Sequence, residues 1–257
     1  MSDLTGQRIA VTGGASGMGA ALLAPLAAAG ARVVSLDRSE AAGRAAAEAA
    51  GIAGFVACDV SDKGSVDAAF AESAALLGGL DTLVHAAGIA PASPAEDITV
   101  EAWDQIFAVN ARGTLLTNQA AFRLIRDGNG GAGGRILNFA SGAGVSGLPN
   151  KAHYSATKGA VVAWSRTAAK EWGKHNVTVN MIAPAIATPM YAKTRSEMSP
   201  QALAALDARL ATDMPIDGRL GDPERDFVPL MLFLCSPGAR FLTGQIYAID
   251  GGLLMVR

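Results

Sequence analysis

Residues 8–19 decide the fold, and they read Arg-Ile-Ala-Val-Thr-Gly-Gly-Ala-Ser-Gly-Met-Gly. An apolar run of strand character ends at Val11, and a glycine-rich turn joins it to an alanine- and leucine-rich run of helical length. Glycine permits positive φ and close approach of the backbone to a pyrophosphate, and the N-terminus of the next helix attracts an anion. A plain glycine-rich turn is the alternative, but the strand–turn–helix context favours a dinucleotide-binding loop. Its expected contacts come from Gly13, Ser16, Gly17, Met18 and Gly19.

The rest of the chain repeats the same alternation of strand and helix. Short runs rich in valine and isoleucine alternate with alanine-rich segments of helical length, at 8–11, 32–36, 54–57, 82–85, 135–139, 177–182 and 245–249. Continuous apolar strands separated by helices indicate a parallel sheet that is covered on both faces. We therefore predict an α/β fold over residues 1–257, a single-domain Rossmann-type, doubly wound, seven-stranded parallel sheet with helices on both faces.

Composition excludes several classes of partner. The chain has 257 residues, half of them hydrophobic, and a net charge of −2, without the clustered lysine and arginine of a nucleic-acid interface. The longest alanine- and leucine-rich stretch, 20–31, is too short to span a membrane. Two separate cysteines, Cys58 and Cys235, form neither a disulfide framework nor a metal site, so we expect buried, reduced thiols. A soluble cytoplasmic protein without metal, nucleic-acid or membrane partners is expected.

Two segments interrupt the alternation. A long excursion at 186–220, rich in methionine and proline, follows the sixth strand and is expected to form a substrate lid. Its middle, 200–212, should be a helix capped by Ser199 with Pro200 in its first turn. The glycine-rich stretch 128–134 is expected to be a flexible surface loop.

Asp37 predicts the choice of cofactor. It ends the second strand, 18 residues after Gly19, near the spacing expected for a carboxylate that binds the adenosine ribose. A carboxylate at this position would repel a 2′-phosphate, which favours NAD over NADP. Arg38 follows directly and could accept that phosphate, so NADP stays open as the alternative.

Tyr154 and Lys158 are the strongest candidates for catalysis. They are four residues apart in a helix-like segment, so their side chains share a face. The ammonium group would stabilise phenolate, and the pair could move a proton while a carbonyl is reduced or an alcohol is oxidised. Ser141 lies just past the fifth strand, where doubly wound sheets bind ligands, and its hydroxyl could donate to a substrate oxygen. Asn110, inside the helix expected to start near Thr99, reads by itself as a packing or capping residue.

With these motifs the chain resembles the classical short-chain dehydrogenases/reductases over essentially its whole length. The resemblance implies a catalytic tetrad of Asn110, Ser141, Tyr154 and Lys158, with Asn110 holding a water next to Lys158 and Lys158 also gripping the nicotinamide ribose. It also implies a homotetramer, with a dimer as the alternative. The further cofactor contacts that it implies are Asp59, Val60, Ala86, Ala87, Gly88, Tyr154, Pro184, Ile186 and Thr188.

The chain departs from the family pattern in two places. His85-Ala86-Ala87-Gly88 stands where the family usually has Asn-Asn-Ala-Gly, and Pro184-Ala185 stands for Pro-Gly. His85 reads as a packed residue at a strand end rather than a catalyst. Alanine at 185 would restrict the backbone where the lid begins.

The expected substrate contacts are mostly apolar and include no clear cationic anchor. They are Ser141, Ala143, Asn150, Tyr154, Met190 and Tyr191. We therefore expect an NAD(P)-dependent oxidoreductase that interconverts a secondary alcohol and a ketone on a small or cyclic, largely apolar substrate. A reductase of 3-oxoacyl thioesters is the first alternative, and Arg112 and Arg123 are the only candidates for the basic surface that it would need. A non-catalytic nucleotide sensor is the second alternative, but it would have no reason to keep the four residues of the tetrad together.

Overall fold

The computed structural model describes residues 3–254, except for the side chain of Met190. Seven strands form one parallel sheet in the order β3-β2-β1-β4-β5-β6-β7. They are β1 (Arg8–Thr12), β2 (Arg32–Asp37), β3 (Gly54–Ala57), β4 (Thr82–His85), β5 (Gly134–Phe139), β6 (Val177–Pro184) and β7 (Ile246–Ile249). All seven predicted strands are confirmed, with ends that differ by at most two residues from the expected ones.

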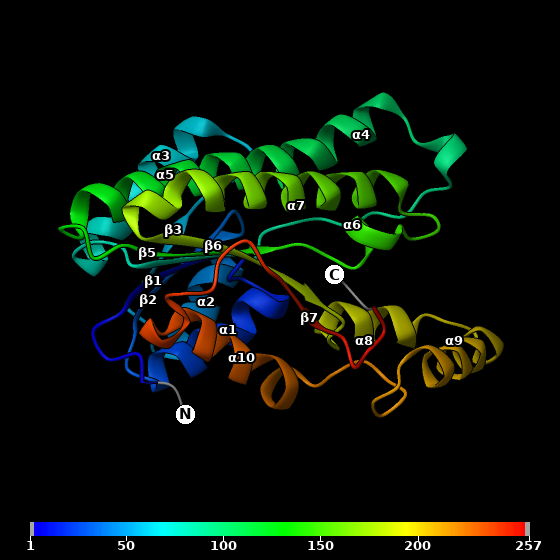
Figure 1. The fold of residues 1–257 in the computed structure, drawn as a ribbon. Coiled ribbons are helices and arrows are strands. Elements are labelled where there is room, and N and C mark those ends of the chain that lie inside the picture. The colour runs from blue at the N-terminus through cyan, green and yellow to red at the C-terminus, as the bar shows by residue number, and fades with distance from the viewer. Residues whose placement is uncertain (1–2, 255–257) are drawn as a thin grey trace.

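Helices cover both faces of the sheet (Figure 1). On one face lie α3 (Lys63–Leu77), α5 (Gly113–Gly128) and α7 (Ala152–Trp172), and on the other lie α1 (Gly17–Ala28), α2 (Glu40–Ala50) and α10 (Val228–Cys235). The strands alternate between two cores. Ile9 and Val11 of β1 pack with Leu22 and Leu26 of α1, whereas Ala10 packs on the opposite side. Both faces of each strand are buried, which is why the strands read as continuous apolar runs.

The order of the strands creates the site. After β1 the chain moves outward to β2 and β3, then returns to place β4 on the other side of β1. The loops that leave β1 and β4 therefore diverge, and a crevice opens beyond the carboxyl ends of these two strands. The glycine-rich turn after β1 and the segment 86–88 after β4 face this crevice.

The excursion after β6 contains two helices, α8 (Pro189–Ser196) and α9 (Pro200–Asp213), at one end of the molecule (Figure 1). The predicted helix and its cap are confirmed, because Ser199 Oγ accepts a hydrogen bond from the Ala202 N–H at 3.3 Å. Helix α8 was not predicted. Arg195 of α8 forms an ion pair with Asp207 of α9, which ties the two helices together.

Cys58 and Cys235 are buried, free thiols, as predicted. None of the helices within residues 3–254 is long and apolar enough to cross a membrane.

Candidate active site

Helix α7 brings Tyr154 and Lys158 together, as their spacing predicts. The Lys158 Nζ atom lies 5.7 Å from the centre of the Tyr154 ring. It is buried and donates a hydrogen bond to the carbonyl oxygen of Phe139 at 2.6 Å, at the carboxyl end of β5. The ammonium group therefore sits between the phenol and the edge of the sheet where the crevice opens.

The surroundings of the pair shift both pKa values. Burial raises the pKa of the Tyr154 phenol, and a side-chain hydrogen bond with Ser141 opposes that rise. Burial lowers the pKa of the Lys158 ammonium to about 8. At neutral pH Tyr154 is thus a neutral proton donor, and Lys158 is still mostly charged and able to stabilise the phenolate that donation would leave.

Ser141 joins the pair through the loop that follows β5. Its Oγ accepts a hydrogen bond from the Ala143 N–H at 3.2 Å, at the start of the short helix α6 (Ala143–Ser146). Helix α6 packs closely on α7 because residue 144 is glycine: a Cβ there would lie 2.6 Å from the carbonyl carbon of Lys158. Gly144 was not predicted to belong to the site. Because it has no side chain, α6 can approach α7, and this approach sets the distance between Ser141 and the Tyr154–Lys158 pair.

Asn110 lies in a π-helical turn, Ala108–Arg112, between α4 (Val100–Phe107) and α5. Its Nδ2 donates to the Ile89 carbonyl oxygen at 2.9 Å and to Thr157 Oγ1 at 3.1 Å, and its Oδ1 accepts from the Ile89 N–H at 2.9 Å. The amide thus ties the loop after β4 to α7, one residue before Lys158. Such π turns are frequent at functional sites. The sequence placed Asn110 in this helix but did not predict the π turn.

A groove of about 460 Å³ runs across the carboxyl ends of the strands. The predicted cofactor residues that line it are Gly13, Ser16, Gly17, Met18, Gly19, Asp37, Arg38, Asp59, Val60, Ala86, Ala87, Gly88 and Thr188. Residues that line it and were not predicted are Leu36, Ser39, Cys58, Ile89, Val109 and Pro189. Most of the latter are apolar and adjoin predicted residues, so no separate signal marks them in the sequence.

The glycine-rich turn leaves no room for side chains on the groove. Gly13 has φ +72°, and a Cβ on it would lie 2.8 Å from the Ala87 nitrogen. A Cβ on Gly19 would lie 2.2 Å from the Gly13 carbonyl oxygen, because the first turn of α1 packs directly on the loop. The bare backbone and the N-terminus of α1 form a cradle that fits a pyrophosphate.

Asp37 closes the other end of the cradle. Its Oδ2 accepts a hydrogen bond from the Ala15 N–H at 3.1 Å, and its Oδ1 accepts one from the Ser39 N–H at 2.9 Å. Arg38 is exposed, and its charge helps to lower the pKa of the Asp59 carboxyl after the larger effect of hydrogen bonds from Ser61. The lining of the groove therefore includes the Asp37 carboxylate, with the charge of Arg38 close enough to affect Asp59.

His85 is a buried residue at the end of β4, as the sequence predicts. Its Nδ1 lies 2.8 Å from Thr12 Oγ1 and 3.1 Å from Thr117 Oγ1, and its Nε2 has no partner among the described residues. Burial, with a smaller contribution from the charge of Lys158, lowers the pKa of its imidazole from 6.5 to about 3. The ring is therefore neutral at physiological pH and holds the ends of β1 and β4 together.

This pKa predicts an acid-sensitive fold. Below pH 6.5 the unfolded chain takes up a proton at His85 that the folded chain cannot accept, so stability falls as the pH falls from 6.5 toward 3. Between pH 7 and pH 5 the free energy of unfolding should fall by about 2 kcal/mol more in the wild type than in His85→Asn. Urea unfolding at both pH values measures the difference, and parallel pH dependences of the two proteins would contradict the prediction.

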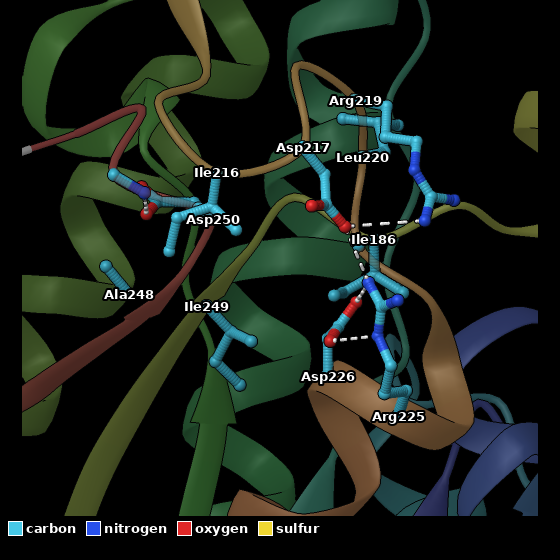
Figure 2. Close-up of a pocket in the computed structure, with 13 residues that line it drawn as sticks. Ile186, Ile216, Asp217, Arg219, Leu220, Arg225, Asp226, Ala248, Ile249 and Asp250 are labelled. Atoms are coloured by element: carbon cyan, nitrogen blue, oxygen red, sulfur yellow. Dashed lines mark hydrogen bonds and ion pairs between the residues drawn. The ribbon is translucent and has the colours of Figure 1, made fainter.

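Ile186 and Pro184 do not line the groove. Pro184 ends β6, and Ile186 is buried against the core that contains Phe227. Ile186 pairs with Gly221 in an isolated bridge, which turns it toward a different cavity of about 470 Å³ (Figure 2). In that cavity Asp217 pairs with Arg219 at 3.4 Å and with Arg225 at 3.0 Å, and Asp226 pairs with Arg225 at 2.8 Å. Each arginine there is neutralised by a carboxylate.

The expected substrate residues lie in different settings. Ala143 is buried beside Ser141, whereas Asn150 is exposed with φ +60°. Tyr191 is half-buried on α8, and its hydroxyl accepts a hydrogen bond from Arg195 Nη1 at 3.3 Å. The side chain of Met190 lies outside the described part of the chain. Near Asn150, the Lys151 ammonium donates to the Ala90 carbonyl oxygen and so ties the loop after β4 to the start of α7.

Comparisons with known proteins add to this geometry. A family model described as enoyl-(acyl carrier protein) reductase matches residues 13–254. The chain is 39% identical over 89% of its length, and 97% of the relative, to the inactive 2-(S)-hydroxypropyl-CoM dehydrogenase 2 of Xanthobacter autotrophicus. It is 36% identical over the whole of both chains to a 2,5-dichloro-2,5-cyclohexadiene-1,4-diol dehydrogenase of Sphingobium indicum.

Two solved structures have the same fold. A short-chain type dehydrogenase/reductase from Mycobacterium ulcerans matches with a TM-score of 0.88 and 29% identity, over 98% of this chain and 91% of that one. A 3-ketoacyl-(acyl-carrier-protein) reductase from Brucella melitensis, complexed with NADH, matches with a TM-score of 0.86 and 32% identity, over 98% of this chain and 99% of that one.

Proposed function

The chain belongs to the short-chain dehydrogenase/reductase family, and from this premise we propose that Tyr154 carries the proton in its reaction. The protein is an NAD(P)-dependent oxidoreductase that interconverts a secondary alcohol and a ketone by hydride transfer. One observation supports the role of Tyr154 above all others: the buried Lys158 ammonium lies 5.7 Å from the centre of its ring, and the side chain of Ser141 acts to lower the pKa of its phenol.

Each side chain then has a distinct task. In the reductive direction Tyr154 donates its proton to the carbonyl oxygen of the substrate, and Ser141 donates a hydrogen bond to the same oxygen to orient it. Lys158 stabilises the phenolate that remains on Tyr154. Asn110 holds the loop after β4 against α7, and so keeps Lys158 in place. A bound nicotinamide supplies the hydride to the carbonyl carbon or accepts it in the reverse direction.

NAD(H) is the cofactor that the groove fits, and Asp37 is the residue that selects it. We expect the wild type to bind NADH at least about tenfold more tightly than NADPH, because the Asp37 carboxylate repels the 2′-phosphate. Asp37→Ser should reduce or reverse this preference for NADH over NADPH, and Arg38→Gln should leave the preference unchanged. Fluorescence titration of both cofactors measures the ratio, and tighter binding of NADPH by the wild type would show that Arg38 dominates.

The substrate is a small or cyclic, largely apolar alcohol or ketone. Support comes from the side chains near the site: Val145 and Leu148 are exposed apolar residues beyond Ser141, and the two arginines in the cavity beside Ile186 are paired with aspartates. A neighbouring carboxylate substrate would find no unpaired cation among these residues. The name of the Sphingobium relative, a dehydrogenase of a cyclic diol, agrees with this class.

A screen of secondary alcohols, ketones and a 3-oxoacyl thioester, followed by the absorbance of NADH, tests the proposal. Turnover of cyclic or small neutral substrates is the expected result. Faster turnover of the thioester would favour the alternative, a reductase of 3-oxoacyl thioesters. The similarity to the Brucella enzyme supports this alternative. Binding of NADH without turnover of any member would favour a nucleotide sensor.

A homotetramer in the cytoplasm is the state that we propose for the protein, with a dimer as the alternative. Light scattering checks the assembly, and a mass near the 26.0 kDa of one subunit would refute both states. The resemblance to the family is what supports this assembly.

A further inference from the structure

The edge of the sheet opposite the cofactor groove contains a second large cavity, which we name the amino-edge cavity. It has a volume of about 820 Å³ and lies where β1, β4, β5 and β6 begin. The segment that follows α10 forms its remaining wall. Its lining residues are Gln7, Asp81, 131–135, Gly173, 176–178, Pro237, Arg240, Phe241 and Thr243.

Arg135 is a buried cation in this cavity with incomplete hydrogen bonding. Only 9% of it is exposed, and its Nη1 donates to Gln7 Oε1 at 3.0 Å. Its Nε has no partner among the described residues. Burial of a guanidinium group with an unmet hydrogen-bond donor is unfavourable. A negatively charged group close to Arg135 would therefore be stabilised there.

The nearby carboxylate does not satisfy Arg135. Both oxygens of Asp81 are engaged by Arg8, at 2.7 and 2.9 Å, and Asn129 Nδ2 adds a further bond at 3.0 Å. Arg135 forms no ion pair within residues 3–254. Arg8 and Asp81 therefore neutralise each other, and Arg135 keeps its charge.

Arg240 adds a second positive charge. It lies at the mouth of the amino-edge cavity, is exposed, and has no hydrogen bond or ion pair from its side chain in the described part of the chain. The lining thus carries two guanidinium groups, those of Arg135 and Arg240, without an ion pair in the described part of the chain, and Asp81 attracts Arg135 only at longer range. Planar guanidinium groups bind carboxylate and phosphate through paired hydrogen bonds.

The glycine-rich loop 128–134, predicted from the sequence as a flexible surface loop, forms one wall of this cavity. Asn129 Nδ2 donates to the carbonyl oxygens of Leu80 at 2.9 Å and Gly133 at 3.0 Å. Gly133 has φ +77°, and a Cβ there would lie 2.1 Å from the Asn176 carbonyl oxygen. The loop is therefore folded tightly between the starts of β4, β5 and β6, which gives the cavity a defined shape.

We propose that the amino-edge cavity binds a small organic anion whose carboxylate or phosphate group is held by Arg135 and Arg240. The hydroxyl groups of Thr178 and Thr243 lie along the same wall and can donate to the remaining oxygens. Phe241, which is 91% exposed, and Pro237 offer an apolar surface for the body of the ligand. This site is separate from the catalytic groove and lies at the other end of the same strands.

Titration of the holoenzyme tests the site. The protein is first saturated with NADH, so that the glycine-rich turn after β1 is filled, and is then titrated by calorimetry with inorganic phosphate and with citrate at constant ionic strength. We expect saturable binding of at least one probe, weakened about tenfold or more in Arg240→Gln. Arg123→Gln is the matched control, because it removes an equally exposed arginine from α5, outside the cavity.

The outcomes separate the proposal from its rivals. Equal binding by the wild type and both variants, or no saturable binding up to about 50 mM, overturns it. Loss of assembly in Arg240→Gln, measured by light scattering, together with no binding of either probe, would assign the cavity to an acidic side chain of a second copy and also overturn it. Arg135→Lys keeps the charge but not the planar fork, so its binding should fall while NADH affinity stays unchanged. None of these results depends on turnover, so they stand apart from the proposed oxidoreductase activity.

Discussion

Tyr154→Phe should lower kcat for ketone reduction about 1,000-fold while the Kd for NADH changes by less than about twofold. The substitution removes one hydroxyl group and leaves the ring beside Lys158. Without the phenol, the site loses the group that donates a proton to the carbonyl oxygen beside Ser141, while the Lys158 ammonium keeps its hydrogen bond to Phe139. Stopped-flow and steady-state absorbance of NADH measure the chemical step, and fluorescence titration measures binding.

Tyr247→Phe is the matched control for this change. Its hydroxyl is buried in β7 and has no partner among the described residues, so its loss should leave both kcat and NADH affinity near the wild-type values. Full turnover by Tyr154→Phe would remove Tyr154 from the mechanism. An equal loss in both variants would show that the effect is structural.

Gly19→Ala should weaken NADH binding about 100-fold. Its new Cβ would lie 2.2 Å from the Gly13 carbonyl oxygen, so α1 and the loop must move apart and the cradle for the pyrophosphate is lost. A 100-fold change corresponds to about 2.7 kcal/mol, which lies within the range for overpacking a rigid site. Fluorescence titration with NADH and urea unfolding measure binding and stability separately.

Gly17→Ala provides the comparison that isolates the collision. Gly17 is the first residue of α1, at φ +57°, but a Cβ there has nothing within 4 Å. The substitution costs only the backbone strain of alanine at positive φ, about 1 kcal/mol, and should weaken binding by less than tenfold. Similar affinities of the two variants would mean that close approach of α1 to the loop is not what forms the cradle.

The sheet and the Tyr154–Lys158 pair could be predicted because each depends on a pattern that is local in sequence. Strands buried on both faces leave continuous apolar runs, and side chains four residues apart share a helix face. The groove followed from the same logic, since the glycines of the first turn mark it before any tertiary contact is known. Short stretches of sequence are therefore enough to predict these parts of the molecule.

The features that were missed depend on contacts between distant segments. Ile186 is expected at the cofactor from the sequence; in the structure it bridges to Gly221, 35 residues later in the chain, and its side chain packs in the core. The loop 128–134 is predicted to be flexible because it is rich in glycine; in the structure Asn129 and Asn176 add hydrogen bonds to Leu80 and Gly131. Composition describes the freedom of an isolated segment and does not predict such contacts between distant residues.

The π-helical turn Ala108–Arg112 makes the position of Asn110 depend on the number of residues in this stretch. A π turn amounts to one residue inserted into an α-helix, and each residue advances an α-helix by about 100°. A deletion of one residue here would let α4 and α5 run on as a regular helix with their buried faces in phase. It would also rotate Asn110 away from Ile89 and Thr157. A one-residue deletion in this stretch should therefore leave the fold intact but abolish the reaction.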